Sequence, residues 1–297
     1  MKYGVVVVTY NRFQLLKECL DAIAGQMKKF EKVVIIDNHS MDDTEAWLET
    51  NQEANWVVKR LESNTGGAGG FCEGVKLALE QDLDWIVLID DDAILDHNFL
   101  NSISTEIETD ETAGNFYPAY AGTVKTKNEI VLRHRTRVGK YIYRNQDVKE
   151  KEYNKHTFLC DFASFCGICI SRQIILKIGY PDKEYFIWND DAEYSMRLRK
   201  YGKIKNVNDA VINHKTELVE VKKVNWKTYY GVRNRINMVK RHYGRISLFY
   251  VIMKAYGAML LHILKNRENS EFIKKVFTAG VMDGVNEKLG KKEDFLP

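Results

Sequence analysis

Three adjacent aspartates, Asp90, Asp91 and Asp92, directly follow the apolar run Trp85–Ile89. A short apolar run that ends in polar residues is typical of a strand buried on both faces. Adjacent carboxylates repel one another, and no basic residue stands near them in the sequence. A divalent cation removes this repulsion most directly, because Mg²⁺ and Mn²⁺ prefer hard oxygen ligands and complete their shell with substrate phosphates. The triplet therefore predicts a metal–diphosphate site, with a helix N-cap at Asp92 as the structural alternative.

A second acidic cluster, Asp190 and Asp191, stands at the predicted start of a helix, with Trp188 before it and Glu193 after it. Acids in a first helical turn can simply complement the helix dipole. A carboxylate that is ionised at neutral pH can instead act as a general base toward an attacking hydroxyl. His214, at the end of a predicted strand, is either a structural histidine or a metal ligand beside these clusters.

The stretch SNTGGAGGF, residues 63–71, is rich in glycine. It differs from a dinucleotide-binding fingerprint, because Cys72 stands where the third glycine should be and because it follows the third predicted strand rather than the first. One interpretation is a flexible turn. The other is a loop whose backbone amides approach a ligand closely, which is favoured because the run of glycine and alanine exceeds what a turn requires.

The first ninety residues alternate between β-branched strands and amphipathic helices, as in a mostly parallel sheet with helices on both faces. Ser40 is the expected N-cap of the second helix, with Asp43 completing a capping box. The predicted strands lie in KYGVVVVTY, EKVVIIDN, WVVKRLESN and DWIVLIDDD, and the helices in FQLLKECLDAIAGQ, SMDDTEAWLET and FCEGVKLALEQ. Ligands bind such sheets at the carboxyl ends of the strands, so the polar residues after each strand should converge at one edge.

Beyond Asp92 the pattern is less regular. Helices are expected in HNFLNSISTEIE, in RQIILKIG and after Trp188, and strands in LCDFASFCGICIS and in a segment ending at His214. The cysteines of LCDFASFCGICIS are expected to be buried structural thiols rather than metal ligands. The chain is expected to be helical from about residue 225. Residues 1–224 should therefore form the ligand-binding domain, and residues 225–297 a basic, mostly helical region.

The bulk composition is that of a globular protein, with 45% hydrophobic and 29% charged residues. A net charge of +3 gives no reason to expect nucleic-acid binding. An odd number of cysteines and the lack of a signal-peptide pattern indicate a cytoplasmic protein. Bases are concentrated between Lys222 and Lys275, where Glu268 and Glu271 are the only acids.

Residues Ile246–Leu264 form an apolar stretch that is long enough to span a membrane. Lys254 in its middle and bases at both ends argue against a span and favour amphipathic helices on an anionic membrane. The alternative is a helical subdomain that packs on the core or on a second copy of the chain. In the second case the protein would be a homo-oligomer.

Taken in order, VVVTYNR, VVIIDN, SNTGGAGGF, LIDDD, WNDDAEYS and NH resemble the motifs of inverting family-2 glycosyltransferases with the GT-A fold, over residues 1 to about 240. GGAGGF, DDD and WNDDAEY together are most similar to the motifs of bacterial galactofuranosyltransferases. Rhamnosyltransferases that use a dTDP-sugar resemble them nearly as well. The resemblance implies a GT-A type α/β fold, Rossmann-like, with a C-terminal helical subdomain. It also implies transfer of galactofuranose from UDP-galactofuranose, or alternatively of rhamnose from dTDP-rhamnose. The acceptor would be a glycan or polyprenyl-linked glycan of cell-surface polysaccharide synthesis at the inner membrane face.

The resemblance further assigns the donor site. The first-strand loop would meet the diphosphate and ribose, Asp37 and Asn38 would lie near the base, and Mn²⁺ or Mg²⁺ would be the cofactor. The metal ligands carried over are Asp90, Asp92 and His214. The donor-binding residues carried over are Thr9, Asn11, Arg12, Asp37, Asn38, Asn64, Gly67, Asp90 and Asp91.

For the acceptor side, the resemblance assigns Asp191 as the catalytic base, with Trp188 and Asp190 at the acceptor sugar. Asn189 departs from the family pattern, which puts acceptor choice in doubt. YYGVRNRI resembles a family segment whose arginines, Arg233 and Arg235, would meet a phosphate of the acceptor.

Two other classes of protein share parts of this pattern. A non-catalytic nucleotide-sugar-binding protein would keep the acidic clusters but would need no base at Asp191. A nucleotidyltransferase also uses paired aspartates with a metal, but it usually has a glycine-rich, basic loop after the first strand, where this sequence has TYNRF.

Overall fold

The computed structural model describes residues 1–215 and 223–296. The N-terminal half of its central sheet is parallel, in the spatial order β4-β1-β2-β3. These strands are β1 (Tyr3–Thr9), β2 (Lys32–Asp37), β3 (Trp56–Arg60) and β4 (Trp85–Asp90). Strand β1 is buried along its whole length, because its side chains alternate between two covered faces.

The second half of the sheet is mixed, and within the described residues the whole sheet has ten strands. β12 (Ile168–Ser171) runs antiparallel between β4 and β6 (Ala119–Thr126). β13 (Ile204–His214) is parallel to β6, with β10 (Thr157–Cys160) outside it. The short strands β5 (Ala93–Leu95) and β7 (Glu129–Ile130) pair with β13 and β6. The predicted α/β fold is confirmed, and the antiparallel strand β12 joins its two halves.

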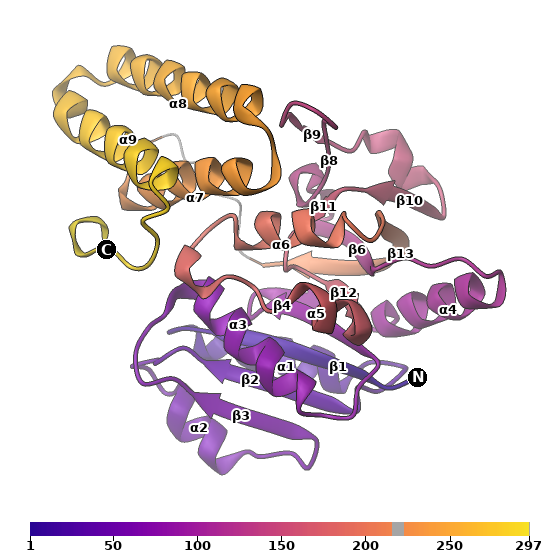
Figure 1. The fold of residues 1–297 in the computed structure, drawn as a ribbon. Coiled ribbons are helices and arrows are strands. Elements are labelled where there is room, and N and C mark those ends of the chain that lie inside the picture. The colour runs from indigo at the N-terminus through magenta and orange to yellow at the C-terminus, as the bar shows by residue number, and fades with distance from the viewer. Residues whose placement is uncertain (216–222, 297) are drawn as a thin grey trace.

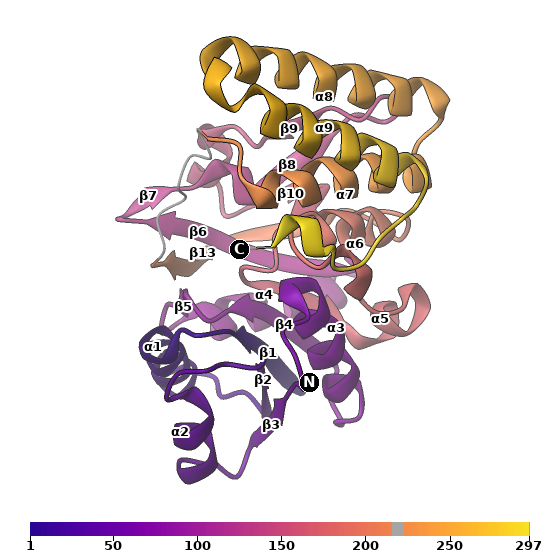
Figure 2. The ribbon, with the colours of Figure 1, turned by 90° about the vertical axis from the view of Figure 1, so that its left-hand side faces the viewer.

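Helices cover both faces of the sheet, and Figure 2 shows α1 and α3 on opposite sides of β1–β3. One face is covered by α1 (Phe13–Ala24), α2 (Thr44–Thr50) and α4 (Phe99–Thr112). The other is covered by α3 (Gly66–Leu79), α5 (Arg172–Ile178) and α6 (Asp190–Leu198). Short 3-10 helices are η1 (Leu132–His134), η2 (Glu150–Asn154), η3 (Lys183–Tyr185), η4 (Arg267–Asn269) and η5 (Glu293–Phe295).

The predicted C-terminal helical region is present as α7 (Trp226–His242), α8 (Arg245–Lys265) and α9 (Ser270–Val285). In Figure 1 these helices stack beyond α6, with α7 nearest to the sheet domain. Ala192 and Met196 of α6 share a buried cluster with residues of α7, α8 and α9, so the helices are joined to the domain by an apolar core. Lys222, where the basic stretch of the sequence begins, lies outside the described residues.

The prediction of one strand in LCDFASFCGICIS is wrong. The segment contributes to β10, to β11 (Phe162–Ala163) and to β12, and β11 belongs to a separate small sheet with β8 (Arg135–Val138) and β9 (Asn145–Asp147). Asp161 interrupts the apolar run, because its buried carboxylate pairs with Arg199 and Lys203. Gly167 then turns the chain with a φ of +78°. The cysteines are buried and form no disulfide, as expected for structural thiols.

Two expected helix starts are also wrong. Helix α2 begins at Thr44 with Asp43 as its N-cap residue, and the Ser40 hydroxyl instead accepts the Asn11 N–H at 2.9 Å. Helix α3 begins at Gly66, so the glycine stretch forms its first turns rather than a loop before it.

Candidate active site

Arg12 lies against the aspartate triplet although the two are far apart in the sequence. β1 and β4 are adjacent parallel strands, so the segments that follow them meet at one edge of the sheet. Arg12 Nη1 lies 3.1 Å from Asp91 Oδ1 and 2.9 Å from Asp92 Oδ2. The Thr9 hydroxyl donates to Asp91 Oδ2 at 2.7 Å. The triplet thus has a basic neighbour in space that is distant in the sequence.

Arg12 does not neutralise the whole triplet. Burial, and then the charges of Asp92 and Asp91, raise the pKa of Asp90 well above its usual range. The charge of Asp190 raises the pKa of Asp90 further, so the two acidic clusters lie within electrostatic range of each other. Burial also raises the pKa of Asp91 to about 6, although Arg12 lowers it. This edge of the sheet is therefore suited to bind a cation.

His214 lies beside the triplet because β13 pairs with β5, a short strand that the sequence does not predict. β5 pairs antiparallel with β13, with Ala93 opposite His214. This pairing places His214 Nε2 3.4 Å from Asp92 Oδ1. The predicted neighbourhood of histidine and acids is therefore present, and metal ligation by His214 stays a prediction.

The predicted metal ligands fit Mn²⁺ or Mg²⁺ by their chemistry. Asp90 and Asp92 offer carboxylate oxygens, which these ions prefer, and His214 offers an imidazole that suits Mn²⁺. The raised pKa of Asp90 shows that its charged form lacks compensation, which a divalent cation would supply. Within residues 1–215 and 223–296, no three histidine, cysteine or acidic side chains are arranged as a ready metal cage.

His134 is a candidate site residue that the sequence did not single out. Its Nδ1 lies 2.7 Å from Ser164 Oγ, and its ring centroid lies 5.6 Å from that of His214. Its buried Nε2 has no hydrogen-bond partner among the residues that the structure describes. Burial holds the pKa of His134 well below its usual range, so the ring is neutral. The segment around it has no regular pattern, and no signal in the sequence could have identified it.

The predicted donor residues Asp37 and Asn11 are engaged by the protein itself. Asp37 is only 1% exposed, and its carboxylate accepts the Ser40 N–H at 2.8 Å and pairs with Arg60 at 2.5 Å. Asn11 Oδ1 accepts the Met41 N–H at 2.6 Å. Both side chains stabilise the loops after β1 and β2, and their contact with a nucleotide stays a prediction.

Asn38 and Asn64 shape the turn that leads into α3. Asn38 Nδ2 donates to the Gly66 carbonyl at 3.0 Å, and its Oδ1 accepts the Thr65 N–H at 3.0 Å. Asn64 Oδ1 accepts the Gly66 N–H at 2.8 Å. The two amides therefore fix this predicted donor loop from within.

Close packing explains most of the glycines in this stretch. Gly66 has a φ of +73°, and a Cβ there would clash with the Phe186 carbonyl oxygen. A Cβ on Gly70 would clash with Val8 of β1. Gly67 alone in this group faces open space, since a Cβ there would meet nothing within 4 Å. Gly67 is therefore the position of this turn that is best placed to admit a ligand.

The second acidic cluster follows a strained segment. Phe186, Trp188 and Asn189 have φ values of +63°, +65° and +64°, a region that costs energy for non-glycine residues. Helix α6 then begins at Asp190, which is buried, whereas Asp191 is partly exposed and Trp188 is 37% exposed. The strained segment thus leads into α6 with Trp188 exposed and Asp191 partly exposed.

Asp191, the predicted general base, has a raised pKa. Burial, and then the charge of Asp190, raise the pKa of Asp191 to about 8, while the Ala192 N–H and the Arg135 guanidinium lower it. The Ala192 N–H donates to Asp191 Oδ1 at 2.7 Å and fixes the carboxylate. Burial raises the pKa of Asp190 to about 6. A carboxylate held in this way takes up a proton at neutral pH more readily than an ordinary aspartate.

Asn234 of α7 holds the strained segment in place. Its Nδ2 donates to the carbonyl oxygens of Tyr185, Ile187 and Trp188 at 2.9, 3.0 and 2.8 Å. Gly231, one turn earlier, leaves room for the Trp188 ring, and its carbonyl accepts from Asn189 Nδ2 at 3.3 Å. Helix α7 therefore sets the position of Trp188 and Asn189, the former a predicted acceptor residue.

Arg233 does not contact an acceptor, contrary to the expectation from the sequence. Its side chain is completely buried and donates to the carbonyl oxygens of Glu184 and Tyr185, each at 3.1 Å, and to that of Gly290 at 2.5 Å. The arginine therefore ties α7 to the segment before Trp188 and to the C-terminal tail. Arg235 of the same motif is exposed.

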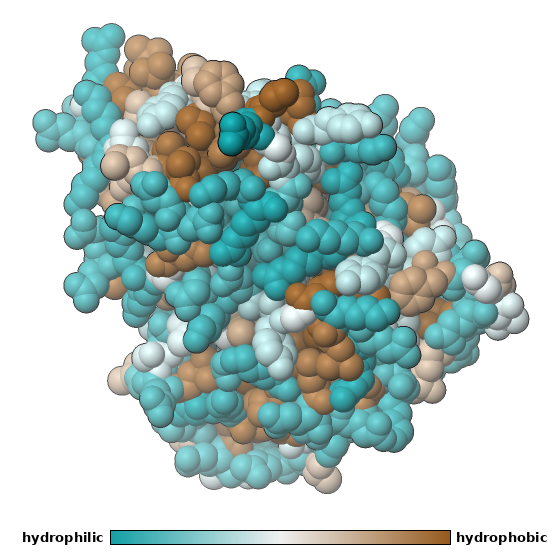
Figure 3. Space-filling view, viewed as in Figure 1, coloured by the Kyte–Doolittle hydropathy of each residue, from teal (hydrophilic) through white to brown (hydrophobic). Residues whose placement is uncertain are grey.

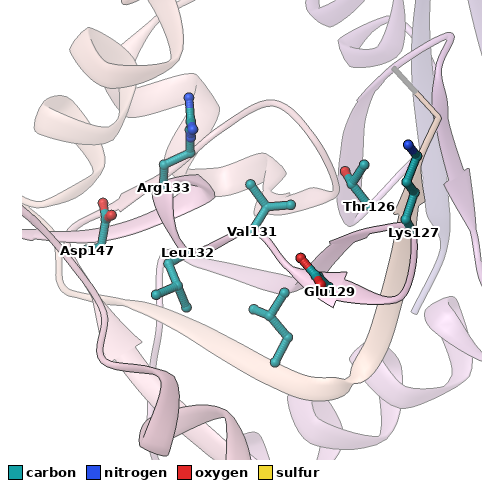
Figure 4. A pocket seen from close by; sticks show the side chains of 8 residues that line it. Thr126, Lys127, Glu129, Val131, Leu132, Arg133 and Asp147 are labelled. Atoms are coloured by element: carbon teal, nitrogen blue, oxygen red, sulfur yellow. The ribbon is translucent and has the colours of Figure 1, made fainter. Parts of the chain in front are cut away.

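A shallow hollow of about 500 Å³ lies along the β6–β7 hairpin and η1 (Figure 4). Figure 4 shows Arg133 and Asp147 at one end and Thr126 and Lys127 at the other. The predicted site residues do not line it, although Arg133 directly precedes His134. The lining residues are Thr126, Lys127, Glu129, Ile130, Val131, Leu132, Arg133 and Asp147.

Comparison with known proteins identifies the family. The sequence profile of glycosyl transferase family 2 matches residues 4–179, which include the aspartate triplet. Galactofuranosyltransferase GlfT1 of Mycolicibacterium smegmatis is 40% identical over 212 residues, or 66% of this chain and 65% of that protein, just under two thirds of its length. dTDP-rhamnosyl transferase RfbF of Shigella flexneri is 22% identical over 301 residues, or 96% of each protein.

A solved structure shares the fold. The crystal structure of S. aureus TarS 1–349 in complex with UDP-GlcNAc superposes with a TM-score of 0.63 at 16% identity, covering 97% of this chain and 83% of that chain. The profile match covers more than half of the sequence and contains Arg12 and the aspartate triplet. The chain therefore belongs to glycosyltransferase family 2.

Proposed function

We propose that this protein is an inverting glycosyltransferase that moves galactofuranose from UDP-galactofuranose to a hydroxyl of a glycan or lipid-linked glycan. The observation that carries the proposal is that the aspartate triplet after β4 lies within electrostatic range of the Asp190–Asp191 pair, in which Asp191 is partly exposed and has a raised pKa. A protein that only binds nucleotide sugars would have no use for that second group. The 40% identity with GlfT1 supports galactofuranose as the sugar.

The donor diphosphate would bind at the carboxyl ends of β1 and β4. Asp90, Asp92 and His214 would hold Mn²⁺ or Mg²⁺ there, which when bound supplies Lewis-acid stabilisation of charge on the diphosphate. The Arg12 guanidinium lies beside the same acids and has a planar set of donors suited to phosphate oxygens.

The acceptor would bind beside Trp188, whose exposed ring offers an apolar face to a sugar. Asp191 would take the proton from the acceptor hydroxyl as its oxygen attacks the anomeric carbon. The bond between that carbon and the diphosphate breaks on the opposite face, and the electron pair leaves with the nucleotide. Attack from the opposite face inverts the anomeric configuration.

Rhamnose from dTDP-rhamnose is the second candidate reaction. It is favoured by the match to RfbF, which extends over 96% of both proteins and includes the C-terminal helices. The two reactions need the same base and cation site, and they differ in the nucleotide base and the sugar.

A thermal-shift screen of UDP, dTDP, GDP and NAD, each with and without Mn²⁺, tests this proposal. A ligand that binds only the folded state raises the melting temperature with the logarithm of its occupancy. We expect stabilisation by UDP that depends on Mn²⁺, and stabilisation by dTDP would instead favour rhamnose. Stabilisation by NAD alone, or by no nucleotide, would contradict a nucleotide-sugar site.

The transfer rate should rise with pH through the pKa of Asp191. The base must be deprotonated, and burial with Asp190 raises its pKa to about 8, so the deprotonated fraction increases between about pH 6 and 8. We expect kcat to increase about tenfold per pH unit well below this pKa and to level off above it. A profile of kcat at saturating donor and acceptor measures this, and a flat profile from pH 6 to 9 would exclude Asp191 as the titrating group.

Asn234→Ala should reduce turnover more than donor binding. The variant removes the donor group that holds three carbonyl oxygens of the strained segment, so Trp188 and Asp191 should shift. We expect kcat to fall about ten- to hundredfold and the free energy of unfolding to fall by about 1–3 kcal/mol. The affinity for UDP should change less than kcat, since Arg12 and the aspartate triplet follow β1 and β4 and do not belong to the strained segment.

The matched control for Asn234→Ala is Asn286→Ala, an exposed asparagine in the same helical region. It should have no effect on kcat. An equal loss of kcat in both variants would show that α7 does not position the acceptor side specifically.

A further inference from the structure

The outward side of α8 is apolar along its whole length. Ile246, Phe249, Met253, Leu260 and Leu264 are each more than half exposed. Their spacing of three, four, seven and four residues puts them on one side of the helix, which we call the outer face. Gly257, in the gap, faces open space. Figure 3 shows apolar side chains gathered over α8.

The opposite side of α8 is part of the protein core. Val251, Leu248 and Ile252 pack into a cluster with α7 and α9, and Met259 and Ile263 pack into a second one. Among the described helices, α8 alone is long and apolar enough to cross a membrane, judged by length and composition only. A spanning helix would have to leave these clusters and carry Lys254 through the bilayer centre, which is costly. The geometry suits a helix that lies on a surface.

Positive charges flank the outer face. At 100° per residue, Lys254 and Lys265 project at one border of the face and Arg245 at the other, and all three are exposed. The sequence has no acid between residues 223 and 267. Long basic side chains at the borders of an apolar face can reach lipid phosphates while the apolar residues enter the acyl region.

We propose that the outer face of α8 binds an anionic lipid bilayer, with the helix lying in the plane of the headgroups. A second copy of the chain is the competing occupant. No acid lies between residues 223 and 267, so this face offers few partners for the bases of a second copy, whereas an anionic bilayer can pair with Arg245, Lys254 and Lys265 together. The inference goes beyond the proposed reaction and does not depend on which sugar is transferred.

Docking in this way would bring the membrane close to the acceptor side of the site. Helix α7 packs against α8 on one side, and through Gly231 it contacts the Trp188 segment on the other. One helix thus separates the membrane-facing surface from the residues proposed to bind acceptor. This arrangement suits an acceptor glycan that is anchored in lipid.

Sedimentation with vesicles tests the proposal. The full chain is mixed with vesicles of phosphatidylcholine containing phosphatidylglycerol, or of phosphatidylcholine alone. We expect binding to the anionic vesicles and at least about tenfold weaker binding by the double variant Phe249→Ser, Leu260→Ser. Lys254→Gln should weaken binding about fivefold, and added salt should weaken it in the unchanged protein.

The matched control is Leu176→Ser, which changes a similarly exposed leucine on α5 and should bind vesicles like the unchanged protein. All variants should keep the UDP-dependent thermal shift of the unchanged protein. A loss of vesicle binding can then be distinguished from a failure of the proposed nucleotide-sugar site. No binding to anionic vesicles, or equal binding by the double variant, would overturn the proposal. The proposal would also be overturned if sedimentation velocity showed that the unchanged protein is a dimer and the double variant a monomer, while both bind vesicles equally.

Discussion

Asp191→Asn is expected to abolish sugar transfer while UDP still binds. Asparagine keeps the shape of the side chain and can still accept the Ala192 N–H, but it cannot take the acceptor proton. Loss of a general base costs about 10²–10⁴-fold in rate. The predicted donor residues follow β1, β2 and β4, whereas Asp191 lies on α6, so the affinity for UDP should stay within about twofold. Initial rates and UDP titrations of both proteins measure these two effects.

The same substitution should stabilise the fold at high pH. The pKa of Asp191 is raised in the folded state, so its contribution to stability is present below the unfolded pKa and is lost as pH rises through about 8. The unchanged protein then carries a partly buried charge that asparagine removes. We expect the variant to be more stable by about 1–3 kcal/mol at pH 9 and by less at pH 5.

Chemical denaturation at the two pH values measures this difference. Asp294→Asn, which changes an exposed aspartate of the C-terminal tail, is the control and should change neither rate nor pH dependence. Near-normal turnover of Asp191→Asn would show that the base lies elsewhere.

Asp92→Ala should remove the dependence of UDP binding on Mn²⁺. Asp92 is the acid that lies nearest to His214 and also contacts Arg12, so its loss takes a carboxylate from the predicted cation site. We expect the affinity for UDP in Mn²⁺ to fall at least about tenfold and to match the affinity measured with a chelator. Calorimetric titration of UDP with Mn²⁺ and with EDTA gives both values.

Asp91→Asn, which changes the neighbouring acid, is the matched control for this test. Its amide oxygen can still accept from Thr9, and Asp91 is not among the predicted metal ligands, so UDP binding should remain dependent on Mn²⁺. Equal affinity of Asp92→Ala and the unchanged protein in Mn²⁺ would exclude Asp92 as a ligand.

Much of the site could be predicted because local signals mark it. An uninterrupted β-branched or apolar run followed by polar residues identified β1, β2 and β4 and the residues at their carboxyl ends. The acids at the start of α6 and the histidine at the end of β13 were placed correctly for the same reason.

The contacts within the site could not be predicted, because they depend on which strands are neighbours. Arg12 meets Asp91 only because β1 lies beside β4, and His214 meets Asp92 only because β5 pairs with β13. The resemblance of YYGVRNRI to a family segment predicts an acceptor contact for Arg233, but the sequence does not show that backbone carbonyls satisfy this arginine in the interior.

The packing role of the glycines could not be predicted for a similar reason. Most of the residues between Gly66 and Gly74 are glycine, cysteine or alanine because α3 lies close to β1 and to Phe186, and the sequence cannot distinguish close packing from a ligand loop. The segment around His134 carries short strands in two sheets, which are too brief to give a hydrophobic period.

One transfer reaction tests the proposed mechanism most directly. The protein is incubated with UDP-galactofuranose, Mn²⁺ and a panel of lipid-linked acceptor glycans, and the anomeric configuration of the product is determined by NMR. We expect a product whose new linkage has the configuration opposite to that of the donor, and a rate with Asp191→Asn that is at least about 100-fold lower. A product with retained configuration, or near-normal transfer by that variant, would contradict the proposed mechanism.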